Sequence, residues 1–178
     1  MKSIEGTRTE ENLRAAFAGE SQARNKYTFF AERARRDGYE QIAAIFEQAA
    51  EHEKQHAKRL YRYLGEIGDT SANLEMAAQG ENYEHTEMYP EFERVAREEG
   101  FEDIADFFRG VGEAEQEHER RFRVLKDRVD GGSVFERDEE SCWHCRNCGC
   151  IQMGQMPPDR CPVCAHPRSF FEINFENF

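Results

Sequence analysis

The chain has 178 residues, which is enough for one ordinary domain or for one domain with a small appendage. Its formal net charge of −12 at pH 7 argues against a nucleic acid or an anionic membrane surface as a partner. The sequence has no apolar run of about 18 residues and no apolar segment behind a basic N-terminus, so we expect a soluble protein of the cytoplasm.

The first predicted helix runs from about Thr9 to Arg36. The segment Thr7-Arg8-Thr9-Glu10 is typical of a capping box, and Asp37-Gly38 ends the helix. Apolar side chains recur along it every three or four residues, which is the period of a helix with one buried face. Glu20 falls within this inward stripe, where a core residue would be expected.

The second predicted helix runs from about Tyr39 to Leu64. Glu53 and His56 lie within its apolar stripe, three residues apart and therefore on one face. Gly65 and Gly68-Asp69 then break the chain. Polar side chains on such a stripe are costly to bury unless they pair with each other or bind a metal.

Two further helices are predicted, one from about Ser71 to Glu99 and one that follows Gly100 and ends near Val129. They align with the first two helices after a slip of one residue. We place this slip near Pro90, where a helix would kink or bulge.

The polar pattern of the first hairpin recurs in the second. A Gly-Glu pair at residues 19–20 reappears at residues 80–81, and a Glu-x-x-His pattern at residues 53–56 reappears at residues 115–118. One copy alone is explained equally well by a solvated charged face. Two aligned copies on apolar stripes instead indicate a duplicated helical hairpin that carries two halves of one metal site.

Together the halves offer four carboxylates and two imidazoles, which is the ligand set of a two-iron site in a four-helix bundle. Carboxylate oxygens with one imidazole per metal suit iron or manganese, whereas a thiolate site would be softer. These six candidate ligands are Glu20, Glu53, His56, Glu81, Glu115 and His118.

The halves differ at one position. Glu84 lies three residues after Glu81 and on the same helical face, whereas the corresponding residue of the first half is Ala23. Glu84 is therefore a seventh candidate ligand, with a surface glutamate as the alternative interpretation. Tyr27 and Tyr89 lie near the ligands and could donate hydrogen bonds, although the residues alone favour a core position for both.

After the helices, Gly131-Gly132 begins a segment of different composition. We expect the helical bundle over residues 1–131, a linker over 132–138 and a separate small domain over 139–178. This tail is too short for a large core and therefore needs a cross-link, such as a bound metal or disulfides, to be stable. Its small core is predicted to contain Trp143, Phe170, Phe171 and Phe175.

All six cysteines lie between residues 142 and 164, and four of them form two Cys-x-x-Cys knuckles. Four thiolates would make a closed tetrahedral site for iron or zinc, and disulfides are disfavoured in a cytosolic chain. Cys142 offers a competing frame with Cys145, but Gly149 directly after Cys148 suits a tight knuckle turn. Cys142 and Cys150 then remain spare thiols. The predicted ligands are Cys145, Cys148, Cys161 and Cys164.

The chain resembles the rubrerythrin family over nearly its whole length. The resemblance is carried by residues 16–24, 56–60 and 87–90, and by the tail knuckles with residues 164–167. It implies an all-α, ferritin-like four-helix bundle joined to a rubredoxin-like domain. It also implies a cytoplasmic enzyme that reduces hydrogen peroxide to water in oxidative-stress defence, with electrons from an external donor such as a rubredoxin or its reductase.

The resemblance also implies how the metals are held. The seven candidate residues would bind two non-haem irons, with Glu53 and Glu115 bridging them. One iron would exchange Glu84 for His56 as the redox state changes, and both Tyr27 and Tyr89 would lie close to the site. The four cysteines would hold one further iron, with zinc as the alternative. Cys150 stands where the family has a tyrosine, so the surroundings of the sulfurs differ here.

A ferritin-like bundle joins its second and third helices by a crossover along the bundle. The second helix would be about 38 Å long at about 1.5 Å per residue, whereas the connection at about Gly65 to Thr70 spans only about 20 Å. We therefore expect a domain-swapped homodimer, with an up-down-up-down order within one chain as the alternative. Each iron pair would take its first-hairpin ligands from one subunit and its second-hairpin ligands from the other.

Two other functions compete with peroxide reduction. A ferritin-like protein that oxidises and stores iron would explain the bundle but would leave the cysteine domain without a role. An electron carrier or a zinc-stabilised binding module would leave the carboxylates unexplained.

Overall fold

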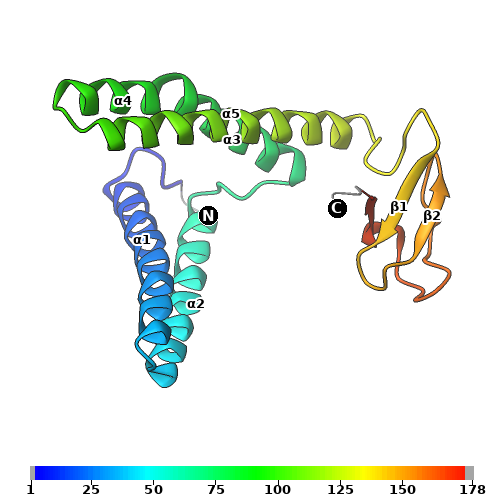
Figure 1. Cartoon of the computed structure of the whole chain (residues 1–178), viewed down its shortest axis with the longest axis horizontal. Coiled ribbons are helices and arrows are strands. Elements are labelled where there is room, and N and C mark those ends of the chain that lie inside the picture. Colours follow the sequence, from blue (N-terminus) through cyan, green and yellow to red (C-terminus); the bar gives the residue numbers. More distant parts are fainter. Residues whose placement is uncertain (1–2, 175–178) are drawn as a thin grey trace. The chain divides into compact units, whose positions relative to one another are not determined.

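The computed structural model describes residues 3–174 of the chain. It contains two compact units, Met1–Gly68 and Asp69–Phe178 (Figure 1). None of the helices in the described residues is both long and apolar enough to cross a membrane.

The first unit is a hairpin of two helices, α1 (Arg8–Arg36) and α2 (Glu40–Tyr63), drawn blue to cyan in Figure 1. The capping prediction is confirmed, because the Thr7 hydroxyl accepts a hydrogen bond from the backbone N–H of Glu10 at 3.3 Å. The Glu10 carboxylate in turn accepts from the backbone N–H of Gly6.

Small residues form the buried centre of the contact between α1 and α2. Ala31, Ala34 and Ala43 are buried there, with Phe46 packed against them. Larger apolar side chains on the same helices remain exposed, including Ile42 and Ile45, which are 47% and 57% exposed. The hairpin therefore buries a narrow alanine seam and leaves a broad apolar face open in the single chain.

The second unit begins with a helical run that changes its hydrogen bonding in the middle. Helix α3 (Thr70–Tyr83) continues into a π-helical turn, η1 (Glu84–Met88), and then into α4 (Tyr89–Glu98). In this turn the backbone N–H of Tyr89 donates to the carbonyl of Glu84, five residues back. A π-turn inserts one residue into a helix, which accounts for the one-residue slip between the repeats.

Helix α5 (Glu102–Asp130) packs against α3, η1 and α4 to complete the second hairpin. As in the first hairpin, the buried residues are small, namely Ala78, Ala96 and Ala105.

The tail folds into a three-stranded antiparallel sheet of order β2-β1-β3, made of β1 (Ser141–Cys145), β2 (Ile151–Gly154) and β3 (Phe171–Ile173). A short 3₁₀ turn, η2 (Arg168–Phe170), precedes β3.

The core of the tail is built around Trp143, whose indole N–H donates to the carbonyl of Gly154 at 2.9 Å. Phe171 is buried beside it, as predicted. The prediction for Phe170 was wrong. This ring is 37% exposed and packs edge-on against His166, with ring centroids 4.5 Å apart, instead of entering the cluster around Trp143. The remaining predicted core residue, Phe175, lies outside the described residues.

Candidate metal centres

The first hairpin brings its three candidate ligands together. Glu20 comes from α1, and Glu53 and His56 come from one face of α2. One ligand atom of each lies within 4.8 Å of the others. His56 Nδ1 is 2.9 Å from a carboxylate oxygen of Glu53 and 3.7 Å from one of Glu20.

The second hairpin repeats this arrangement. Glu81 on α3 meets Glu115 and His118 on α5, again with ligand atoms within 4.8 Å of one another. His118 Nδ1 is 2.6 Å from Glu115 and 4.0 Å from Glu81. The sequence repeat is therefore also a repeat in space, with one glutamate and one Glu/His pair in each half.

Crowding of carboxylates has an electrostatic consequence in both halves. The pKa of Glu20 is raised, chiefly because it shares a hydrogen bond with Glu53. The pKa of Glu81 is raised chiefly by burial and then by Glu115. A bound cation would remove this repulsion, so the donor set fits a hard divalent metal such as iron or manganese.

The seventh candidate, Glu84, lies in the π-helical turn and outside the tight group of three. Its charge still reaches the site, because it contributes to the raised pKa of Glu81 after burial and Glu115. It also raises the pKa of Tyr89, where burial is the larger cause. Glu84 thus faces the second half-site without joining its closest cluster.

The two candidate tyrosines occupy similar aromatic clusters. Tyr27 packs against Phe30 and Phe46, with centroids 6.4 and 6.2 Å apart. Tyr89 packs in the same manner against Phe92 and Phe108. Burial is the largest cause of the raised pKa of Tyr89, and the nearby carboxylates make a smaller contribution. A role for Tyr27 at the site stays a prediction.

In the tail, the four predicted cysteine sulfurs also converge within 4.8 Å. Cys145 and Cys164 have sulfurs 3.8 Å apart, and those of Cys148 and Cys161 are 3.6 Å apart. Metal–sulfur bonds of about 2.3 Å in a tetrahedron place the sulfurs about 3.8 Å apart. All six cysteines are free thiols, so the tail fits a tetrahedral metal rather than disulfides.

Two tight turns present these sulfurs. In the first, Gly149 adopts φ +76° and donates its N–H to the carbonyl of Cys145 at 2.8 Å. In the second, Ala165 adopts φ +58°, a region that non-glycine residues rarely occupy. A backbone hydrogen bond at His166 lowers the pKa of Cys164 to about 6, which favours the thiolate that a metal requires.

The spare thiols lie beside this group and not within it. Cys142 sits on β1 opposite Met153. Cys150 packs against the tail core and lies 3.5 Å from the side-chain amide of Gln152.

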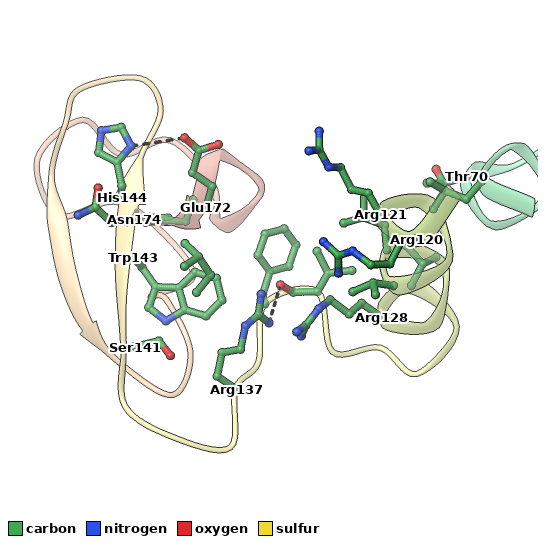
Figure 2. Close-up of a pocket in the computed structure, with 18 residues that line it drawn as sticks. Thr70, Arg120, Arg121, Arg128, Arg137, Ser141, Trp143, His144, Glu172 and Asn174 are labelled. Atoms are coloured by element: carbon green, nitrogen blue, oxygen red, sulfur yellow. Dashed lines mark hydrogen bonds and ion pairs between the residues drawn. The ribbon is translucent and has the colours of Figure 1, made fainter. Parts of the chain in front are cut away.

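A large groove in the second unit holds none of these centres. Its volume is about 1100 Å³, and neither the seven carboxylate and histidine residues nor the four cysteines line it. Figure 2 shows Arg120, Arg121 and Arg128 on one side of it and Trp143 and His144 on the other. The candidate chemistry therefore lies elsewhere.

Sequence patterns did not reveal one polar cluster in the second hairpin, in which His85 contacts Glu119. Each of these residues directly follows a candidate ligand in the sequence. This adjacency was the one sequence feature that could have indicated the cluster.

Comparisons with known proteins agree with both centres. The family model described as rubrerythrin matches residues 11–126, and the model for the rubrerythrin rubredoxin-like domain matches residues 143–172. The chain is 51% identical to a rubrerythrin of Porphyromonas gingivalis, covering 99% of this chain and 95% of that protein. It is 47% identical to a rubrerythrin of Nitratidesulfovibrio vulgaris, covering 97% of each. A solved structure of partially reduced nigerythrin is 35% identical over 93% of this chain and 86% of that one, with a TM-score of 0.37.

Proposed function

The chain belongs to the rubrerythrin family, with a ferritin-like di-iron domain and a rubredoxin-like domain, and we propose that it reduces hydrogen peroxide to water. Electrons would come from an external donor, such as a rubredoxin or its reductase, and pass through an iron on the four cysteines. The observation that carries this proposal is the pairing in one chain of two matched carboxylate–histidine half-sites with a tetrathiolate site.

Reduction of peroxide needs two electrons and a way to stabilise charge as the O–O bond breaks, and a pair of bound irons supplies both. The residues of this chain would hold that pair. Glu53 and Glu115 would bridge the irons, and the other carboxylates and the two histidines would complete their coordination. Glu84 would alternate with His56 as ligand to one iron, as the family resemblance implies. Glu84 is the candidate ligand that has no counterpart in the first half, where Ala23 takes its place.

The half-sites also support a shared, dimeric centre. Each hairpin brings together only three of the seven ligands, with Glu84 near the second group. Helix α2 has 24 residues and is therefore about 36 Å long, whereas the connection from Leu64 to Asp69 can span only about 20 Å. The exposed apolar faces of the hairpins need a partner. We propose that two copies exchange hairpins to supply it.

A direct test compares the two oxidants on the same protein. The protein would be loaded with iron, reduced without oxygen and mixed rapidly with peroxide or with oxygen while absorbance is followed. We expect peroxide to reoxidise the iron pair much faster. Faster reaction with oxygen would instead support iron oxidation and storage, and reaction with neither would support an electron carrier.

The electron route has its own test. Cys161→Ser removes one of the four thiolates, so we expect loss of the visible spectrum of a cysteine-bound iron and loss of turnover with an external donor. A single reoxidation of chemically reduced protein by peroxide should persist, because the carboxylate ligands are intact. Cys142→Ser is the matched control and should keep both activities. Undiminished donor-driven turnover in Cys161→Ser would contradict the proposed route.

A further inference from the structure

Four polar side chains form a connected network inside the second hairpin. His85 Nε2 lies 2.5 Å from a carboxylate oxygen of Glu119, and the two side chains are 13% and 12% exposed. The same carboxylate accepts hydrogen bonds from the Asn82 amide at 3.2 Å and from the Arg123 guanidinium at 2.6 Å.

The position of the network relative to the metal site is informative. Asn82 directly follows Glu81, and His85 directly follows Glu84. Glu119 likewise directly follows a candidate ligand on α5. Consecutive residues of a helix are about 100° apart, so the network lies beside the ligand cluster and joins the helices that carry it.

His85 belongs to the π-helical turn, which also carries Glu84. This turn is a local departure from α-helical geometry, and such turns are frequent at functional sites. The contact between His85 and Glu119 joins the π-helical turn to α5. A largely buried, charge-assisted hydrogen bond is stronger and more directional than the exposed ion pairs elsewhere on these helices.

The first hairpin has different residues at the positions that form this network in the second hairpin. The residues after its corresponding positions are Ser21, Arg24 and Ala57. The Ser21 hydroxyl donates to the backbone carbonyl of Phe17 within its own helix. Ala57 offers no polar group where the second hairpin has Glu119. The network thus accompanies the π-turn and the extra glutamate.

We propose that His85 is a positioning residue: held by Glu119, it fixes the π-helical turn against α5 and so sets how far Glu84 can reach toward the metal. This inference rests on the proposed metal site. It adds that the contact between His85 and Glu119 limits the movement of Glu84, because both His85 and Glu84 lie in the π-helical turn.

Metal affinity tests this inference without reference to turnover. Mn²⁺ prefers carboxylate over thiolate ligands, so its binding to the full-length protein reports the carboxylate centre. Free Mn²⁺ would be followed by electron paramagnetic resonance in the parent protein and in His85→Phe, Glu84→Ala and the double variant. Loss of a residue that orients a metal ligand typically weakens binding about 10- to 100-fold.

We expect His85→Phe to weaken binding of the second Mn²⁺ by about tenfold when Glu84 is present, and to change it little in the Glu84→Ala background. His85→Gln, which can still donate to Glu119, should recover part of the loss. Arg94→Ala breaks exposed ion pairs with Glu91 and Glu98 on α4 and is the control, expected to bind as the parent does.

Unchanged Mn²⁺ affinity in folded His85→Phe would overturn the inference. So would an equal loss with and without Glu84, because His85 would then act on the hairpin in general. If His85→Phe does not fold, Glu119→Gln carries the same test with a smaller volume change. A parent protein that binds no Mn²⁺ at the carboxylates would instead refute the metal site, and a parent that binds Mn²⁺ but ignores peroxide would refute only the proposed activity.

Discussion

The two hairpins have the same ligand pattern but different backbones. Both place a glutamate opposite a Glu/His pair and pack through alanines. The first is made of two uninterrupted helices, whereas the second contains a π-turn, the extra Glu84 and the His85–Glu119 contact. A single inserted residue thus accompanies the extra glutamate and the buried polar contact of the second half. A duplicated hairpin can become asymmetric by a local change of hydrogen bonding while its ligand geometry is preserved.

The largest expected effects come from Glu53 and Glu115, the proposed bridging ligands, where the halves should be equivalent. We expect Glu53→Ala and Glu115→Ala each to lower peroxide turnover by more than about a hundredfold, because each would remove a ligand that we propose both metals share. Steady-state assays with iron analysis of each variant check this. Glu51→Ala, which breaks exposed contacts with Lys54 and Gln55 on α2, should keep full turnover. A large loss in just one of the two bridging variants would break the equivalence.

A medium effect is expected where the halves differ. A carboxylate is anionic and stabilises ferric iron more than ferrous iron, whereas a neutral imidazole does so less. We therefore expect Glu84→Ala to raise the reduction potential of the iron pair and His56→Ala to lower it. Tenfold to hundredfold changes in relative affinity correspond to shifts on the order of 60 to 120 mV. A spectroelectrochemical titration measures both, and shifts of the same sign would contradict ligand exchange.

The smallest expected effect separates the two tyrosines. Tyr89 lies close enough to the second half-site for its carboxylates to influence its pKa, whereas Tyr27 shows ring packing with Phe30 and Phe46. Tyr89→Phe should slow reoxidation by peroxide roughly fivefold, the value of one hydrogen bond at about 1 kcal/mol. Tyr27→Phe should leave it unchanged in the same stopped-flow measurement. Equal slowing of reoxidation in both variants would contradict this difference between Tyr89 and Tyr27.

Periodicity and capping residues made the helices predictable. The first helix was expected from Thr9 and begins at Arg8, and the second was expected over about Tyr39 to Leu64 and spans Glu40–Tyr63. The third was predicted as one helix, but it contains the π-turn. The repeat alignment located a slip there, yet a one-residue shift in hydrogen bonding leaves no mark in composition.

The candidate site could likewise be predicted only in part. The ligand candidates could be identified because they recur at fixed spacing on apolar stripes, and Gly149 favoured the cysteine frame whose sulfurs the structure brings together. The contact of His85 with Glu119 could not be predicted, because it joins residues 34 positions apart on two helices. Which side chains meet there depends on the rotation that the π-turn introduces, and only the folded hairpin fixes that rotation.

The central claim is that each iron pair is shared between two copies of the chain, and mixed dimers test it most directly. Glu53→Ala and Glu115→Ala chains, each inactive alone, would be unfolded, mixed in equal amounts and refolded with iron. If hairpins are exchanged, a mixed dimer carries both defects in one site and none in the other. Random pairing then restores peroxide turnover to about a quarter of the parent value. If each chain builds its own site, every site keeps one defect, and the mixture would stay as inactive as its components.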